Sequence, residues 1–98
     1  MLIKANRLAE ALPHAREAVC INPRSARNHY LLAKALARQK DLEESFRHLR
    51  LASEIDPNYP EPHYLLGQLY QRRGERKEAD REFALFEETS KRLPHKRQ

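Results

Sequence analysis

The sequence predicts an all-α fold built as a row of antiparallel helical hairpins. Two observations carry this prediction: a segment that repeats along the chain, and apolar side chains that recur with the period of a helix. The tetrapeptide His-Tyr-Leu-Leu begins at His29 and returns at His63, which sets the offset at 34 residues (63 − 29). Aligning residues 26–59 with 60–93 adds five identities, at 38/72, 44/78, 47/81, 51/85 and 54/88. Repeats of this length bury their apolar faces by stacking on neighbours.

Composition favours a single soluble helical domain. The 98 residues include two glycines and no tryptophan, and 34% of them are charged. A chain this short buries about 60–65% of its unfolded surface, so a deep catalytic cavity is not expected. The single Cys20 cannot form an internal disulfide and is expected to be a small buried residue. The sequence has no signal-peptide pattern and no membrane span, so we expect a cytoplasmic location.

The net charge of +5 is concentrated at the C-terminus. Residues 1–90 carry 15 Lys and Arg against 14 Asp and Glu, a net of +1 (15 − 14). The other four cations are Lys91, Arg92, Lys96 and Arg97. A short basic run at a chain end is usually a solvated terminus, so the charge does not favour a nucleic-acid partner. We interpret residues 1–93 as one domain and residues 94–98 as a basic tail.

The first helix is expected over residues 7 to 20. Its apolar residues at helical spacing on one face are Leu8, Leu12, Ala15 and Val19. Pro13 lies in this segment, and a proline in a helix interior costs about 3 kcal/mol. That penalty shrinks near the first turns, so we expect a start near Leu8 rather than a long helix from Leu2.

The second helix is expected over residues 26 to 38, and the third over residues 42 to 55. Pro23 separates the first two helices, because the residue before a proline avoids helical geometry, and Ser25 can cap the second. Asp41 precedes Glu44 by three residues, which is the spacing of a capping box. The third-helix residues expected to face inward are Leu42, Phe46, Leu49, Ala52 and Ile55.

Pro60 and Pro62 flank the expected start of the fourth helix, since proline is tolerated in a first turn. Gly74 ends it, because glycine readily takes the positive φ of a helix C-terminus. The fifth helix is expected over residues 76 to 91, with Phe83 and Phe86 on its apolar side. The loops between these helices are short, so neighbouring helices must run antiparallel.

The last repeat carries a characteristic set of residues: His63, Leu66, Gly67, Tyr70, Ala79 and Phe83. The middle repeat matches it with His29, Leu32, Ala33, Leu36, Ser45, Leu49, Ala52 and Pro57. This pattern resembles the tetratricopeptide repeat family, with departures at His63 (Trp in the family) and Lys91 (Pro). The resemblance implies a tetratricopeptide-like right-handed superhelix of five helices: half a repeat (6–25) and two full ones (26–59 and 60–93). It also implies that Ala33 and Gly67 let the two helices of a repeat approach closely.

The resemblance further implies a non-catalytic module for protein interaction, whose concave groove is lined by the first helix of each repeat. The groove-facing places carried over to this sequence are Tyr30, Lys34, Arg38, Tyr64, Gln68 and Arg72. Tyrosine rings beside cations suit an extended peptide with acidic and apolar groups, and no small-molecule substrate is implied. Alternatively, the tyrosines belong half to the core and the cations form a solvated face. The places of the family's carboxylate clamp hold Tyr30 and Lys34, so that specificity is not predicted.

No sequence pattern indicates catalysis, a cofactor or a metal. The chain has no Gly-rich phosphate loop, nucleophile elbow or His-Glu-x-x-His motif. His29 and His63 are repeat-equivalent, so we interpret them as packing residues rather than metal ligands. We therefore expect neither enzyme activity nor a bound cofactor.

The first repeat lacks its first helix, because only five residues precede Asn6. Leu8 and Leu12 are then left without the neighbour that the repeat architecture provides. A second function therefore remains open, that of a structural or assembly segment of a larger solenoid, docking through its N-terminal helix. A homodimer formed through this helix is a further alternative.

Overall fold

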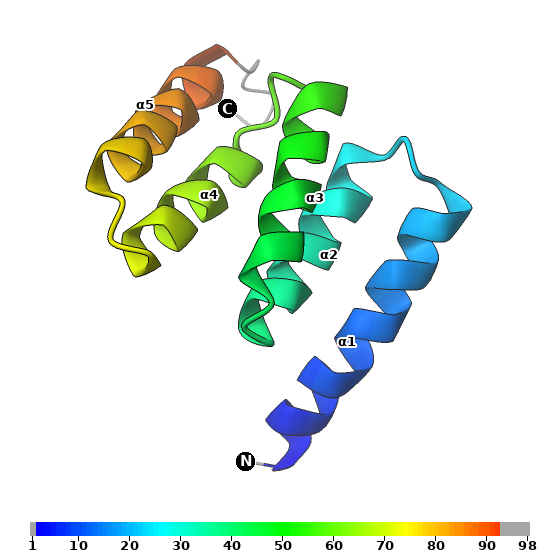
Figure 1. Cartoon of the computed structure of the whole chain (residues 1–98). Coiled ribbons are helices and arrows are strands. Elements are labelled where there is room, and N and C mark those ends of the chain that lie inside the picture. The colour runs from blue at the N-terminus through cyan, green and yellow to red at the C-terminus, as the bar shows by residue number, and fades with distance from the viewer. Residues whose placement is uncertain (1, 93–98) are drawn as a thin grey trace.

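The computed structural model describes residues 2–92, and the side chains of residues 10–92. The described chain consists of α1 (Leu2–Ile21), α2 (Ala26–Arg38), α3 (Leu42–Ile55), α4 (Glu61–Arg72) and α5 (Arg76–Arg92). Each helix packs against the next, so the chain is all-α and forms sequential helical hairpins (Figure 1). The helices α2 and α4 also touch, which places the first helices of the two full repeats side by side. Lys96 and Arg97 of the basic tail lie outside the described residues.

Helix α1 is longer than the sequence suggested, and the expected start near Leu8 is wrong. It runs from Leu2 to Ile21 with Pro13 in its interior. Pro13 is exposed, so the backbone carbonyl that loses its helical partner can bond to water instead. Alanines in this segment add helix propensity, which helps the helix to continue through the proline. Among the described residues, no helix is long and apolar enough to cross a membrane.

Both expected residues stand at the helix starts, but only Ser25 makes the expected side-chain bond. The Ser25 hydroxyl accepts a hydrogen bond from the Asn28 N–H at 3.1 Å, as expected for the cap of α2. Asp41 stands at the cap of α3 but makes no side-chain bond to it, so the expected capping box does not form. The Glu44 carboxylate instead accepts two hydrogen bonds from Arg16 of α1, at 3.0 and 3.2 Å. A charged partner on a neighbouring helix outweighs the local cap.

Helices α2 and α4 end in the same way, 34 residues apart. Lys40 has φ = 67° and Gly74 has φ = 78°. After α4, the Glu75 N–H donates to the Tyr70 carbonyl at 2.9 Å, and Gly74 donates to Gln71 at 3.0 Å. The bonds after α2 match them: Asp41 to Leu36 at 2.9 Å and Lys40 to Ala37 at 3.0 Å. Both turns are Schellman motifs, and one of them forces a lysine into left-handed geometry.

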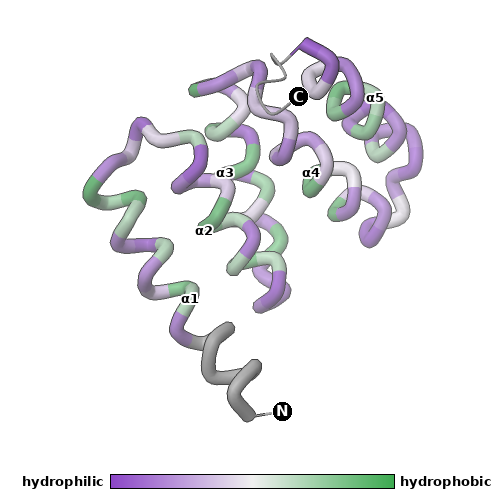
Figure 2. The backbone as a smooth tube through the Cα atoms, turned by 180° about the vertical axis from the view of Figure 1, so that it is seen from behind, coloured by the Kyte–Doolittle hydropathy of each residue, from purple (hydrophilic) through white to green (hydrophobic). Residues whose placement is uncertain are grey.

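The core lies between the two full repeats and confirms most of the inward-facing residues. Phe46, Leu49 and Ala52 are buried, and Leu42 packs against them. Ile55 is 40% exposed and Cys20 is exposed, so both of these expectations are wrong. Ile55 lies in the last turn of α3, beyond the core. Cys20 lies on α1, which among the described helices packs against α2 alone. In Figure 2 the coloured part of α1 carries both hydrophobic and hydrophilic residues.

The two helices of each full repeat approach closely where the small residues predicted it. The Ser45 hydroxyl donates to the Ala33 carbonyl at 2.8 Å, which ties α2 to α3. A Cβ atom added at Gly67 would lie 2.6 Å from the Phe83 ring. The glycine therefore makes room for this ring, which occupies the place that Leu49 takes one repeat earlier.

Candidate functional site

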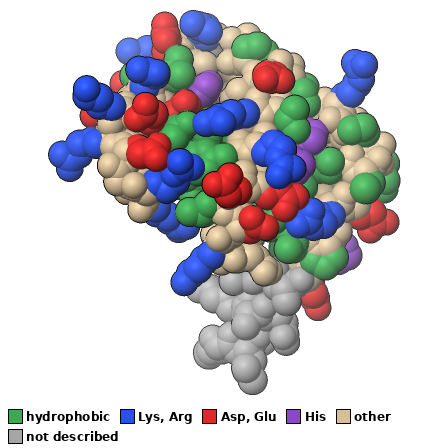
Figure 3. All heavy atoms as spheres, in the orientation of Figure 1, with side chains coloured by type: hydrophobic (Ala, Val, Ile, Leu, Met, Phe, Trp, Pro, Cys, Tyr) green, Lys and Arg blue, Asp and Glu red, His purple; other side chains and the backbone are tan. Residues whose placement is uncertain are grey.

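The six groove residues lie on two adjacent helices. Tyr30, Lys34 and Arg38 belong to α2, and Tyr64, Gln68 and Arg72 belong to α4. All are exposed except Tyr30, which is half-buried. Cations and acids are interspersed over the face drawn in Figure 3, with hydrophobic side chains between them. A mixed surface of this kind makes local clusters more informative than the net charge.

On α2, an aromatic ring and a cation lie together. The Lys34 Nζ atom is 5.7 Å from the centroid of the Tyr30 ring. Tyr30 in turn packs edge-to-face on Tyr59, with ring centroids 5.6 Å apart. Burial, followed by the charge of Glu61, raises the pKa of the Tyr30 hydroxyl above its ordinary value. Tyr30 therefore keeps its proton at neutral pH and can donate a hydrogen bond.

The equivalent tyrosine on α4 has different neighbours. Tyr64 is 45% exposed, and its ring centroid is 5.6 Å from that of Phe83 and 5.1 Å from that of Phe86. Both phenylalanines belong to α5. Each tyrosine thus packs on other aromatic rings and keeps part of its surface accessible.

The structure brings Arg38 and Arg72 to one hollow. It has a volume of about 630 Å³ and is lined by Ala37, Arg38, Lys40, Leu42 and Arg72. Its lining contains three cations and no acid, over an apolar base of Ala37 and Leu42. Guanidinium groups held near an apolar surface suit a carboxylate attached to an aliphatic chain.

A second hollow lies between α1 and α2, with a volume of about 470 Å³. It is lined by Ala11, His14, Ala15, Ala18, Asn28, Leu31, Lys34, Ala35 and Arg38. Lys34 and Arg38 therefore face this hollow, and Arg38 also lines the hollow that it shares with Arg72. The sequence indicated the hollow between α1 and α2 only indirectly, because residues 6–25 match the second half of a repeat.

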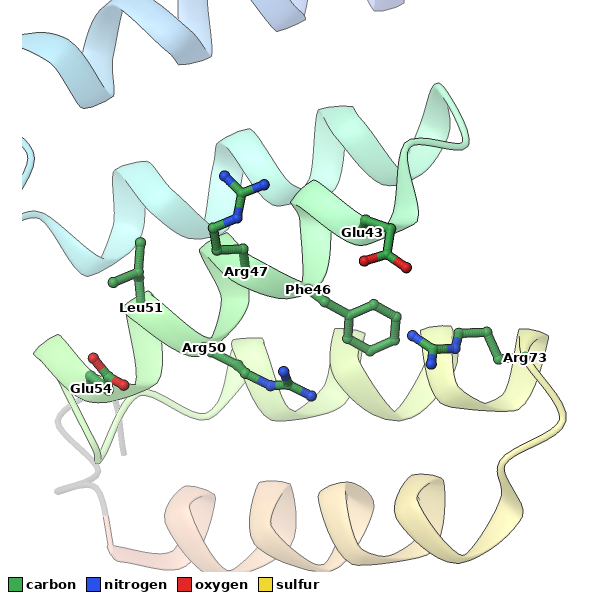
Figure 4. A pocket seen from close by; sticks show the side chains of 7 residues that line it. All are labelled: Glu43, Phe46, Arg47, Arg50, Leu51, Glu54 and Arg73. Atoms are coloured by element: carbon green, nitrogen blue, oxygen red, sulfur yellow. The ribbon is translucent and has the colours of Figure 1, made fainter.

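A third hollow, of about 500 Å³, follows α3 and was not predicted (Figure 4). Its lining consists of Glu43, Phe46, Arg47, Arg50, Leu51, Glu54 and Arg73. The guanidinium carbons of Arg50 and Arg73 lie 5.7 and 4.7 Å from the centroid of the Phe46 ring. Arg50 also donates to the Tyr70 hydroxyl at 2.7 Å. The sequence signal was faint: Arg47 is one of the residues identical in both repeats.

A pair of histidines joins α2 to α3. The Nδ1 atoms of His29 and His48 are 2.9 Å apart, and His29 Nε2 is 2.7 Å from the Pro23 carbonyl oxygen. A carbonyl only accepts, so His29 Nε2 carries a proton and its Nδ1 accepts from His48. His29 is the buried packing residue that the sequence predicted, whereas the contact with His48 was missed.

The surroundings of His48 and Glu44 shift both of their pKa values. Burial and then the charge of His29 lower the pKa of His48, although Glu44 acts in the opposite sense. The hydrogen bonds from Arg16 lower the pKa of the Glu44 carboxyl. One repeat later, His63 contacts the Glu82 carboxylate at 2.8 Å, so an acid takes the place of His48. Within the described residues, no three His, Cys, Asp or Glu side chains form a metal-binding group.

Comparison with known families identifies the class of protein. A family model described as TPR repeat matches residues 35–74, and one described as Tetratricopeptide repeat matches residues 2–45. Together they span residues 2–74. The chain belongs to the tetratricopeptide repeat family, whose members generally mediate protein–protein interactions and are typically non-catalytic.

The chain also resembles solved structures of MamA. MamA from Desulfovibrio magneticus RS-1 is 28% identical, with a TM-score of 0.81 over 94% of this chain and 52% of that one. An RS-1 double mutant of MamA is 29% identical, with a TM-score of 0.79 over 92% and 51%. Another MamA structure, 18% identical with a TM-score of 0.81 over 92% and 53%, shows the shared fold alone. The chain thus spans about half the length of these proteins. No curated protein matches it.

Proposed function

We propose that this chain is a protein-interaction module that binds an extended peptide with acidic and apolar groups on α2 and α4. The observation that carries the proposal is the hollow shared by Arg38 and Arg72, which has three cations and an apolar base. Tyr30 on α2 and Tyr64 on α4 each keep part of the side chain accessible to a ligand. The rings would pack aliphatic side chains, and the guanidinium groups would pair with carboxylates.

The test is a titration of the ¹⁵N-labelled chain with an extended peptide of alternating glutamate and leucine. Saturable shifts are expected for the amides of Tyr30, Arg38, Tyr64 and Arg72. A double substitution, Arg38→Ala with Arg72→Ala, should weaken binding roughly 10- to 100-fold, since charge-assisted hydrogen bonds contribute about 1.5–3 kcal/mol. Arg81→Ala, on the exposed side of α5, serves as the matched control and should leave affinity unchanged.

Two results would count against the peptide-binding groove. The first is a peptide whose affinity does not respond to the double arginine substitution. The second is equal binding of a lysine-and-leucine peptide of the same length, because a cationic ligand should be repelled by Arg38 and Arg72. Raising the salt concentration should weaken binding of the acidic peptide, since the charges of Arg38 and Arg72 are exposed.

A second candidate function is favoured by the open side of α1. Among the described helices, α1 packs against α2 alone and is linked to α3 by the Arg16 and Glu44 ion pair, and the hollow between α1 and α2 is mostly apolar in its lining. The chain would then act as a structural or assembly segment that docks another helix through α1. The helix would come from a further protein, from a second copy of the chain or from another part of a larger solenoid.

A further inference from the structure

We propose that the hollow between α1 and α2 is a docking site for one amphipathic α-helix of a partner protein. The partner helix would present bulky apolar side chains to α1 and acidic residues to Lys34 and Arg38. This inference rests on the second candidate function and specifies the partner's chemistry.

The repeat itself shows that a helix covers this face elsewhere in the molecule. Adding 34 to Ala11 and Ala15 gives Ser45 and Leu49 on α3. Both of these residues are 0% exposed, and α2 packs against α3. Ala11 is exposed and Ala15 is half-buried, although they occupy the same places in their repeat. The face that a helix closes in the full repeat is therefore open in the first one.

The covering helix of the full repeat defines the kind of occupant that fits. Helix α2 buries Leu32 and Leu36, which are 2% and 1% exposed. It also places Ala33 close to α3, where the Ala33 carbonyl accepts the hydrogen bond from Ser45. A helix with two leucines four residues apart and a close-approach position next to the first would present the same face to α1.

At one place on this face, α1 carries a smaller side chain than its counterparts on α3 and α5. Ala15 stands where α3 has Leu49 and α5 has Phe83. The close-approach position on the covering helix lies over this place, since a Cβ at Gly67 would meet Phe83. An occupant therefore needs a larger residue than Ala33 or Gly67 at that position to fill the space over Ala15.

Charge favours an acidic partner. The lining contains Lys34, Arg38 and His14 and no acid. Arg38 also shares a hollow with Arg72, so residues at this position of neighbouring first helices lie close together. The residue at the same position of a docked helix would lie beside Arg38, where a carboxylate is attracted and a cation is repelled.

A synthetic peptide tests the proposal directly. The probe has the sequence of residues 25–39 with Ala33→Leu, Lys34→Glu and Arg38→Glu, so that it brings bulk and acid to the required places. Titrated into the ¹⁵N-labelled chain, it should give saturable shifts for the amides of Ala11, Ala15, Ala18, Leu31 and Ala35. A second peptide that keeps Lys34 and Arg38 should bind at least fivefold more weakly, and the difference should shrink in high salt.

Variants of the chain test the geometry. Ala15→Glu should weaken the probe at least tenfold, whereas Ala84→Glu, at an exposed alanine of α5, should have no effect. Circular dichroism of both variants shows whether each remains folded. Ala15→Leu is a milder change, since Leu49 occupies this place on α3. This variant should reverse the preference for leucine over alanine at position 33 of the probe, so that the probe with alanine there binds more tightly.

Several results would overturn the proposal. No saturable shift, or a preference that Ala15→Leu does not reverse, would exclude the helix-docking geometry. Shifts confined to Tyr64, Gln68 and Arg72 would place the peptide on the α2 and α4 groove, which contradicts docking on α1 while leaving the peptide-binding function intact. Shifts at Ala11 and Ala15 that grow with chain concentration, without peptide, would assign the site to a second copy instead.

Discussion

At the scale of single residues, the two repeats place different side chains in the same structural role. Lys40 and Gly74 both end a helix at positive φ, and only glycine does so without strain. Ala33 and Gly67 both mark the close approach of two helices: the Ala33 carbonyl accepts from Ser45, and a Cβ at Gly67 would meet the Phe83 ring. In each pair, the residue of one repeat is a substitution that the same fold already accommodates in the other repeat.

Lys40→Gly is expected to stabilise the fold. A non-glycine residue in left-handed geometry costs about 1–2 kcal/mol, whereas the extra freedom of glycine in the unfolded chain offsets about 0.5–1 kcal/mol of this gain. The free energy of unfolding should therefore rise by about 0.5–1 kcal/mol in urea denaturation. Gly74→Lys should change it in the opposite direction, since no neighbouring atom lies within 4 Å of the added Cβ and only backbone strain acts. An unchanged midpoint in both variants would contradict this account of the turns.

Gly67→Ala is expected to destabilise the fold by up to about 2 kcal/mol. Its Cβ would lie 2.6 Å from the Phe83 ring, and overpacking of this kind costs about 1–3 kcal/mol, less about 1 kcal/mol gained in helix propensity. Phe83→Leu should relieve the clash, because the pair then matches Ala33 and Leu49. Denaturant unfolding of both single variants and the double variant measures the coupling. Strictly additive effects would show that the ring does not limit position 67.

At the scale of the helices, each contact between neighbours depends on a few polar bonds as well as on apolar packing. The His29 and His48 rings join α2 to α3, and the Arg16 and Glu44 pair joins α1 to α3. The Asn28 side chain donates to the Ala18 carbonyl at 3.1 Å and holds α1 on α2. No local sequence pattern predicts these bonds, because they connect residues that only the packing of the helices brings together.

The histidine pair is expected to make stability depend on pH in the weakly acidic range. Because burial and His29 lower the pKa of His48, the folded chain binds fewer protons than the unfolded chain just below the ordinary value of about 6.5. Stability should be complete above about pH 6.5 and fall as the pH drops below it. The charged groups around His48 are Glu44 and Arg47 on α3, with His29 opposite on α2. Urea unfolding at pH 7.5, 6.5 and 5.5 measures the change.

Two histidine variants separate this effect from general acid sensitivity. His48→Gln should flatten the dependence between pH 7.5 and 5.5, whereas His14→Gln, at an exposed position on α1, should leave it unchanged. Glu44 affects stability in a lower pH range, because the hydrogen bonds from Arg16 lower the pKa of its carboxyl. The stability that Glu44 contributes is lost only as the pH falls below the ordinary pKa of a glutamate. A wild-type chain equally stable at pH 7.5 and 5.5 would contradict the assignment to His48.

At the scale of the whole molecule, stability should decrease from the centre of the row of helices towards α1. Each described helix packs against its neighbours, and across the row α2 packs against α4 while the Arg16 and Glu44 pair links α1 to α3. The largest fully buried residues lie on α2, α3 and α4, whereas α1 is held by α2 on one side and by the exposed Arg16 pair. Arrays of repeats open from their ends when an end has one neighbour.

Hydrogen exchange should show this gradient. The amides of Ala15 and Ala18 on α1 are expected to exchange at least tenfold faster than those of Leu49 on α3, because α1 can open without disturbing the core. Arg16→Ala should speed exchange in α1 further and leave α3 unchanged, whereas Arg81→Ala should alter neither. Equal protection in α1 and α3 would show that the chain unfolds as one cooperative unit.

The sequence by itself determined the architecture, because a period of 34 residues, helical spacing and turn residues are local signals. It placed α2 and α3 at their observed bounds and identified Ser25, Gly67 and Gly74 in their roles. The predicted groove residues were assigned by analogy between repeats, and the structure gives Tyr30 and Tyr64 different neighbours.

Only the tertiary structure decided the features that depend on distant contacts. These include the continuation of α1 through Pro13, the missing side-chain bond of the Asp41 cap, and the pairing of His29 with His48. It also decided which face stays open, because the burial of Ala15 or Leu49 depends on whether a helix lies across it. Periodicity specifies which side of a helix is apolar, whereas the neighbour that covers that side is set by packing in three dimensions.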